Sequence, residues 1–156
     1  MSTVRVEKTI AAPIDRVFEV ISDHAGYSRF PGIRSSELVR EGEVERNGVG
    51  ALRRIHSRPL LFVEEITGFE RPTRLDYLIR EVNAPLHHQG GSMVLSERGP
   101  DSHIVWTSTF DFTIPVIRRP VGALAGVFVS RAFGKVLDEV ERLAAATEPS
   151  RVAAGV

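Results

Sequence analysis

Residues 120–145 read PVGALAGVFVSRAFGKVLDEVERLAA. Apolar residues recur through this stretch at spacings of three and four, which is the pattern of an amphipathic helix. They are Val121, Leu124, Ala125, Phe128, Ala132, Val136, Val140, Leu143 and Ala144. At 1.5 Å per residue such a helix is about 40 Å long, which is close to the full width of a small domain. We therefore predict one long helix that crosses the whole domain.

The residues before this helix predict a strand and then two short helices. Residues 3–11 alternate between apolar and polar side chains, which indicates a half-buried strand. Pro13 opens residues 13–21, where apolar residues recur at helical spacing. Tyr27 and Phe30 then precede a Pro-Gly pair, which indicates a second brief helix and a turn.

The middle of the chain predicts an antiparallel meander. Short alternating runs are separated by turn sequences such as Asn47-Gly48 and Gly99-Pro100-Asp101. The predicted strands are residues 34–41, 49–57, 60–69, 74–82, 88–97 and 102–113.

This order of elements predicts an α+β fold. A seven-stranded, curved antiparallel sheet wraps around the long C-terminal helix, with two short helices after the first strand. A curved sheet and a straight helix cannot touch everywhere, so we expect a hollow between them. We predict a single domain over residues 1–146, and a disordered tail at 147–156, where no periodicity remains.

Composition excludes several kinds of protein. The 156 residues include 20 Lys and Arg, 20 Asp and Glu, and no cysteine, so disulfides and cysteine-based metal sites are excluded. Balanced charge provides no overall field that would attract nucleic acid. Charged residues at positions 5, 7 and 8 interrupt the apolar run that a signal peptide needs, and residues 121–129 are too few to span a membrane. We expect a cytoplasmic, soluble protein without stable membrane insertion.

Three glycines inside the long helix need an explanation, because each costs about 1 kcal/mol relative to alanine. They are Gly122, Gly126 and Gly134. One interpretation is close packing of the helix on the sheet. The other is room for a ligand beside a bare stretch of helix.

The opening VEKTIAAPIDRVFEVISDHAGYSRFPGI, residues 6–33, combines a strand, an Ala-Pro step, an amphipathic helix and an aromatic residue before Pro-Gly. Later motifs are Asn47-Gly48-Val49-Gly50-Ala51, Glu65-Ile66 followed by Pro72, Leu75-x-Tyr77 and Val105-Trp106-Thr107. Together they resemble the START-like superfamily (SRPBCC, Bet v 1-like), and within it the chain is most similar to the polyketide cyclase/dehydratase-like proteins. The resemblance covers residues 3–146.

The resemblance implies a helix-grip fold with a deep apolar cavity. Members of the superfamily bind lipids, sterols, polyketides or hormones, and some catalyse cyclisation or dehydration. Others serve as toxin or quinone-binding modules. Fold alone does not choose among these functions.

Strand parity selects the apolar candidates for the cavity wall. Trp106 and Phe110 share the aromatic face of the last strand, which we expect to point inward. Tyr77 shares the inward face of an earlier strand, so its hydroxyl needs a buried partner or a ligand. Phe128 belongs to the apolar stripe of the long helix and is a further candidate for ligand contact.

Polar candidates come from three strands. Glu64 is expected inward, where it either pairs with Arg54 or has a raised pKa suited to proton transfer. Arg54 and His56 share one strand face, although the opposite face of that strand is equally mixed in polarity. One of His87 and His88 faces the cavity, and we select His88 as a candidate ligand contact and possible acid or base.

The leading function is binding of a hydrophobic or aromatic small molecule such as a lipid or polyketide, with transport or sequestration as an extension of it. Its candidate site residues are Arg54, His56, Glu64, Tyr77, His88, Trp106, Phe110 and Phe128. We expect no metal, because the five histidines lack ligand spacing and the chain has no cysteine. We also expect no organic cofactor. The alternatives are a cofactor-independent cyclase/dehydratase that uses a cavity His or Glu, and a partner-binding or toxin-like module. We expect a monomer or homodimer.

Arg118 and Arg119, before the apolar helix start, could touch a membrane surface to collect an apolar cargo.

Overall fold

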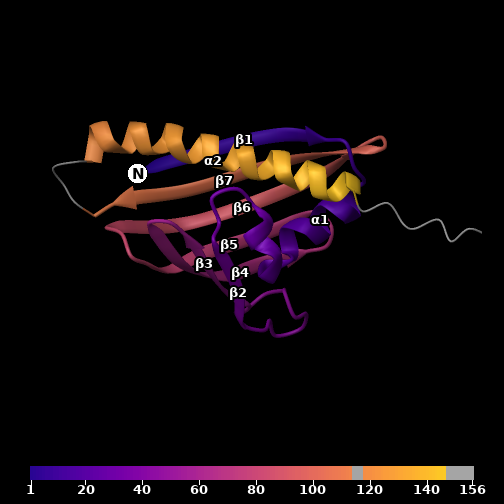
Figure 1. The fold of residues 1–156 in the computed structure, drawn as a ribbon, viewed down its shortest axis with the longest axis horizontal. Helices are drawn as coiled ribbons and strands as arrows, with labels where there is room; N and C mark the ends of the chain where they lie inside the picture. The colour runs from indigo at the N-terminus through magenta and orange to yellow at the C-terminus, as the bar shows by residue number, and fades with distance from the viewer. Residues whose placement is uncertain (114–117, 147–156) are drawn as a thin grey trace, which may run out of the picture.

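The computed structural model describes residues 1–113 and 118–146 and contains one antiparallel sheet with helices on one side (Figure 1). The strands are β1 (Ser2–Ile10), β2 (Ser35–Arg40), β3 (Leu52–Ser57), β4 (Leu60–Glu70), β5 (Arg74–Val82), β6 (Leu86–Arg98) and β7 (Asp101–Phe112). The helical segments are α1 (Ile14–Ser22), the 3-10 helix η1 (His24–Arg29) and α2 (Arg118–Ala146). The predicted fold class is confirmed. The predicted disordered tail, residues 147–156, lies outside the described residues.

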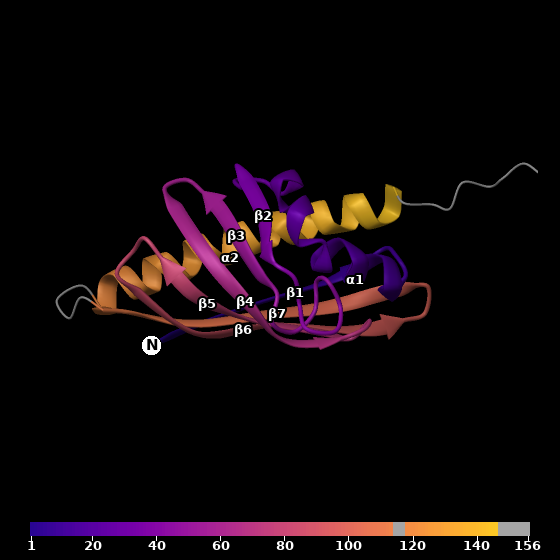
Figure 2. The same cartoon turned by 90° about the horizontal axis from the view of Figure 1, so that it is seen from below.

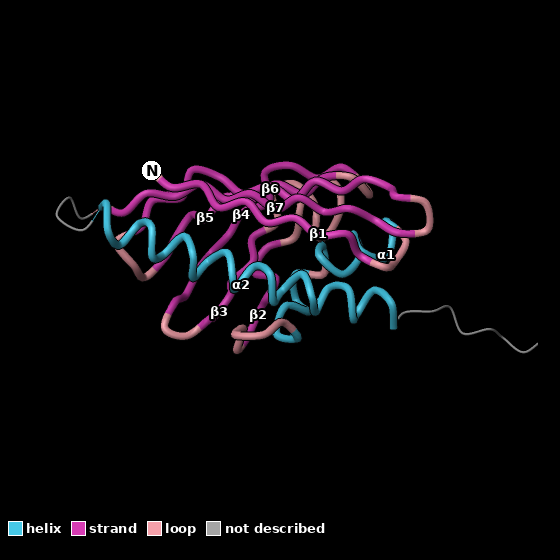
Figure 3. The backbone as a smooth tube through the Cα atoms, turned by 90° about the horizontal axis from the view of Figure 1, so that it is seen from above, coloured by secondary structure: helices cyan, strands magenta, loops and turns pink. Residues whose placement is uncertain are grey.

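The sheet order is β1-β7-β6-β5-β4-β3-β2, so the first strand closes against the last. Strands β2, β3 and β4 bend toward α2, and the sheet therefore curves around the helix (Figure 2). Both α1 and α2 lie on this concave side (Figure 3).

The curved sheet and α2 together form what we call the grip. Its end beside α1 is filled with side chains. Here α1 and the second half of α2 pack against β1, β6 and β7. Fully buried residues at this end are Ile10, Val17, Ile21, Leu75, Met93, Ile104, Leu137, Val140 and Ala144. Lys8 on β1 also pairs with Asp138 and Glu141 of α2, with N–O distances of 2.6 and 3.2 Å. These contacts fix the second half of α2 on the sheet.

At the opposite end, which we call the open end, the described inward side chains are only partly buried. Residues paired across neighbouring strands point to the same side of a sheet, so register identifies the inward side chains there. Phe62 pairs with buried Ile55, and Ile79 pairs with buried Glu64. Four apolar residues point inward by this register and are still partly exposed: Phe62, Ile79, Leu86 and Phe112. Within residues 1–113 and 118–146, burial of the inner apolar side chains is therefore incomplete at the end where α2 begins.

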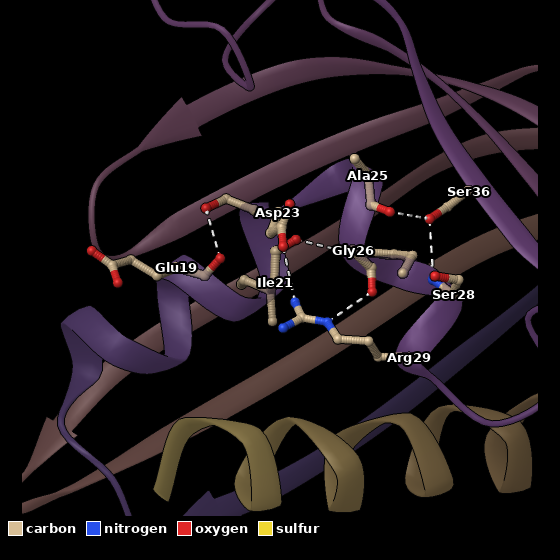
Figure 4. A network of polar contacts seen from close by, with 10 residues as sticks. Glu19, Ile21, Asp23, Ala25, Gly26, Ser28, Arg29 and Ser36 are labelled. Atoms are coloured by element: carbon tan, nitrogen blue, oxygen red, sulfur yellow. Dashed lines mark hydrogen bonds and ion pairs between the residues drawn. The ribbon is translucent and has the colours of Figure 1, made fainter. Parts of the chain in front are cut away.

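Hydrogen bonds hold η1 against β2 beside the filled end (Figure 4). The Ser36 hydroxyl donates to the carbonyl oxygen of Ala25 at 2.9 Å and accepts the backbone N–H of Ser28 at 3.1 Å. Arg29 donates to the carbonyl oxygen of Gly26 and pairs with Asp23. These bonds fix the segment that carries the buried residues His24 and Tyr27.

Candidate functional site

A bulge in β6 determines which histidine faces the interior. The pairing of β6 with β7 shifts between His88 and Gly90. Gly90 has a φ of +146°, which residues other than glycine rarely adopt. The prediction that one of the two adjacent histidines faces inward is confirmed. His88 is buried, whereas His87 is exposed.

Strands β5 and β6 separate beside this bulge. Only four residue pairs join them, from Arg74–Val94 to Tyr77–Gly91. Beyond these pairs lies a hollow of about 500 Å³. Its lining consists of Leu78, Ile79, Arg80, Glu81, Val82, Leu86, His87 and His88. The gap thus lies at the open end of the grip.

The His88 side chain bridges this gap. Its Nδ1 accepts the backbone N–H of Ile79 at 3.0 Å, so Nδ1 carries no proton. The ring proton is therefore on Nε2, which donates to the Ser108 hydroxyl at 2.9 Å. Burial, and then the neighbouring His87, lowers the pKa of His88 to about 4. His88 is accordingly neutral near pH 7, with both nitrogens engaged.

Tyr77 lies between His88 and Trp106. Its ring stacks on the His88 imidazole with the centroids 5.4 Å apart, and its hydroxyl accepts the Trp106 indole N–H at 2.9 Å. The ring lies so close to Gly91 that a Cβ at position 91 would overlap it. Burial, with the Glu64 charge, raises the pKa of Tyr77. The phenol therefore stays protonated and can donate a hydrogen bond.

The hydroxyl groups of Tyr77 and Ser108 are buried in this cluster, and their protons outnumber the hydrogen-bond acceptors around them. Tyr77 is 4% exposed and Ser108 is 5% exposed. Trp106 donates to the first and His88 donates to the second, so neither of these two partners can accept a hydroxyl proton. If one of these hydroxyls donated a hydrogen bond to the other, the proton of the second hydroxyl would still have no acceptor. Among the described residues, at least one hydroxyl proton therefore lacks an acceptor, and a bound molecule could supply it.

An aromatic pair forms the wall beside this cluster. Trp106 stacks face to face on Phe133 of α2, with centroids 3.6 Å apart and an interplanar angle of 5°. Gly126 lies seven residues before Phe133, which is two helical turns, so both face the sheet. Apart from the adjacent residues and the backbone of the helix itself, no described atom lies within 4 Å of the place that a Cβ at Gly126 would occupy, and the same holds for Gly134. Close packing does not explain these two glycines. The surroundings of Gly122 lie outside what the structure describes.

A buried ion pair closes the inner end of the site. Arg53 Nε donates to Glu64 Oε2 at 2.6 Å, and Arg53 Nη1 donates to His24 Nδ1 at 3.2 Å. The guanidinium lies over the Tyr27 ring at 4.5 Å and faces the Tyr77 ring at 5.5 Å. Burial, and then the Arg53 charge, lowers the pKa of His24 to about 3. The charges in this cluster are thus already matched within the protein.

The structure corrects three sequence predictions. Arg54 lies on the outer face of β3 and pairs with Glu37 at 3.3 Å, so it is not the partner of Glu64. His56 shares that outer face, because it alternates with buried Arg53 and Ile55. Phe128 is 75% exposed on the side of α2 that faces away from the sheet.

The other candidates lie on the inner face. Tyr77, Trp106 and Phe110 are inward and buried, as parity predicted, and Glu64 is inward and paired. Parity left the choice between His87 and His88 open, and the buried one is His88. Sequence reasoning missed five residues that contact this group: His24, Tyr27, Arg53, Ser108 and Phe133. Phe133 could have been found, since it is in phase with Leu137, Val140 and Ala144 on the buried face of α2.

No group of three or more His, Asp or Glu side chains able to hold a metal ion occurs within residues 1–113 and 118–146. In the same ranges, no helix has the length and apolar character needed to cross a membrane.

Comparison with known proteins identifies the family. The family model described as polyketide cyclase/dehydrase and lipid transport matches residues 1–145. The chain belongs to this family. No curated protein sequence matches the chain.

Solved structures of other proteins share the fold of this chain. The Zhui aromatase/cyclase from Streptomyces sp. R1128 is 22% identical with a TM-score of 0.78, and the match covers 99% of each chain. A protein from Thermus thermophilus is 21% identical with a TM-score of 0.79, covering 95% of this chain and 100% of that one. A START superfamily protein from Mycobacterium smegmatis is 16% identical with a TM-score of 0.74, covering 90% of this chain and 98% of that one. At these identities the likeness establishes the helix-grip fold alone.

Folding stability is expected to fall as the pH drops below about 6.5. The pKa of His88 is about 4 in the folded protein and its ordinary value is 6.5, so the unfolded chain binds more protons between these pH values. The stabilising contribution is complete above pH 6.5 and is lost as the pH falls to 4. His24 acts in the same direction, down to about pH 3. Urea midpoints from pH 7 to 4 measure the fall. The fall in the urea midpoint from pH 7 to 4 should be smaller in His88→Gln than in the parent protein, and His56→Gln should show the same fall as the parent. The same fall in all three proteins would refute the role of His88.

Proposed function

We propose that the protein binds a hydrophobic, flat small molecule at the open end of the grip. The observation that carries this proposal is the partly exposed inner apolar face there, together with the space that the described residues leave beside Gly126. Burial of apolar ligand surface would supply affinity at about 25 cal/mol per Å². The family to which the chain belongs is described by polyketide chemistry and lipid transport, which agrees with such a ligand.

The polar cluster suggests how the ligand is oriented. Tyr77 and Ser108 together hold a hydroxyl proton that lacks an acceptor among the described residues. A carbonyl, hydroxyl or carboxylate oxygen on the ligand would accept it. The site therefore favours a molecule with an oxygen acceptor at one edge of an apolar body, placed against Trp106 and Phe110. Arg54, His56 and Phe128 lie outside this proposed site.

The geometry favours binding over acid–base catalysis. A general acid or base needs a free, titratable nitrogen or oxygen near the substrate. His88 has both nitrogens bonded and a lowered pKa, and Glu64 is paired with Arg53. Neither residue is free to transfer a proton in this arrangement.

Fluorescence of Trp106, the single tryptophan of the chain, provides the test. The probes are 2-acetylnaphthalene and 2-ethylnaphthalene, which have nearly the same shape but differ in one carbonyl oxygen. Both should change the emission of Trp106 on binding, and the acetyl compound should bind about fivefold more tightly through one hydrogen bond. This preference should disappear in the double variant Tyr77→Phe/Ser108→Ala.

Two glycine variants provide a matched control. Gly126→Leu fills the proposed site and should weaken binding of both probes at least tenfold. Gly134→Leu adds the same side chain about 100° around the helix from Phe133 and should leave binding unchanged. Equal effects of the two substitutions, or no emission change with either probe, would contradict the proposal.

The remaining expectations from sequence also stay proposals. A monomer or homodimer is expected, which light scattering after size exclusion tests. The cytoplasm is the expected compartment, which cell fractionation tests.

A further inference from the structure

The outer face of α2 carries an apolar patch that no described part of the chain covers. Its residues are Leu124, Val127 and Phe128, which are 71%, 53% and 75% exposed. Leu124 and Phe128 lie nine and five residues before inward Phe133, which places them about 180° and 140° around the helix from it. Buried Leu137, Val140 and Ala144 serve the packing of α2, so these three exposed residues are not needed for that purpose.

The stretch of sequence that carries this patch contains charges of one sign, although the chain as a whole is neutral. Residues 112–137 include Arg118, Arg119, Arg131 and Lys135 and contain no Asp or Glu. Arg131 and Lys135 are exposed and form no ion pair with any described residue. Arg131 lies three residues after Phe128, and Lys135 follows one turn later, so both extend the same outer face. An apolar stripe is therefore continued by a cationic one.

We propose that this outer face of α2 docks on an anionic lipid membrane surface. An apolar face bordered by Lys and Arg is the arrangement by which helices lie in the membrane interface. The three apolar side chains would enter the acyl boundary, and Arg131 and Lys135 would contact the headgroups. A stable protein interface buries about 800 Å² on each partner, which three side chains on one convex helix do not approach. The lipid surface is therefore the partner that fits.

The position of the patch gives this docking a purpose. The same half of α2 carries the patch on its outer side and Gly126 on its inner side, above the open end of the grip. Docking would bring that open end close to the bilayer, where an apolar ligand is concentrated. Docking itself does not depend on which molecule the interior binds, so it is tested without ligand.

Flotation of the full chain with vesicles tests the proposal. One preparation contains equal phosphatidylcholine and phosphatidylglycerol, and the other contains phosphatidylcholine alone. The protein should float with the anionic vesicles and stay behind with the neutral ones. Raising NaCl from 0.1 to 0.5 M should release it, because salt screens the attraction to the headgroups.

Matched variants locate the contact. Leu124→Ser/Phe128→Ser should weaken vesicle binding at least tenfold, whereas Val94→Ser, at an exposed valine on the outer face of β6, should not change it. Arg131→Gln and Lys135→Gln should each weaken binding about fivefold. Arg98→Gln removes an equal charge at the far end of β6 and should have no effect. Circular dichroism melting confirms that each variant is folded.

Several results would overturn the proposal. One is equal binding to neutral and anionic vesicles, and another is equal loss with Arg98→Gln and Arg131→Gln. A third outcome combines two results: the protein does not bind vesicles, and it forms a dimer that Leu124→Ser/Phe128→Ser dissociates. This outcome would assign the face to a second copy of the chain. Failure of vesicle binding with retained naphthalene binding would overturn docking and leave the proposed interior site intact.

Discussion

Arg53→Met is expected to destabilise the fold by about 3–5 kcal/mol. The substitution leaves the Glu64 carboxylate buried without its partner at 2.6 Å, and His24 loses the hydrogen bond that its Nδ1 accepts. It also removes the guanidinium from the Tyr27 ring, which it covers at 4.5 Å. Urea unfolding at pH 7 measures the loss.

The neighbouring residue supplies the control for this experiment. Arg54→Met breaks only an exposed ion pair with Glu37, so its cost should stay below about 1 kcal/mol. The double variant Arg53→Met/Glu64→Leu replaces both charges with apolar groups and should recover most of the stability. A cost for Arg54→Met equal to that of Arg53→Met would refute the assignment of the buried pair.

Gly91→Ala is expected to destabilise the protein by about 2–3 kcal/mol and to disrupt the candidate site. The added Cβ would overlap the Tyr77 ring. The ring cannot turn away freely, because it stacks on His88 and accepts the Trp106 indole N–H. Urea unfolding reports the loss of stability, and the emission of Trp106 reports the changed surroundings of the indole.

Gly126→Ala is the matched control for this second substitution. A Cβ at position 126 meets no described atom within 4 Å outside the adjacent residues and the backbone of its own helix. Since alanine favours a helix by about 1 kcal/mol over glycine, this variant should be as stable as the parent or more stable. A Gly91→Ala protein with unchanged stability and unchanged emission would contradict the packing described for Tyr77.

Periodicity was sufficient to predict the elements, because each buries one face. Residues 102–113 place aromatic side chains on one face and polar ones on the other, and β7 buries Trp106 and Phe110 accordingly. The strand predicted at 49–57 begins only at Leu52, since the turn before it extends through Gly50. Element type therefore followed from the pattern, and the boundaries depended on the turns.

The sequence predicted the wrong orientation for side chains on elements whose two faces have similar polarity. β3 carries Arg53 on one face and Arg54 on the other, so only tertiary packing decides which arginine is buried. In α2 the apolar residues continue around the helix, with Phe133 inward and Phe128 outward. Hydrophobicity alone cannot choose between them. The network around His88 depends on the β6 bulge, which the sequence pattern does not reveal.

The imidazole bridge between β5 and β6 has a mechanical consequence for the sheet. The gap in the sheet lies between the four β5–β6 residue pairs and the turn that joins Val82 to Leu86. The hydrogen bond from the Ile79 N–H to the His88 ring crosses this gap. Because the two strands are joined on either side of the gap, a molecule that entered between them would have to break this bond and could leave the four residue pairs in place.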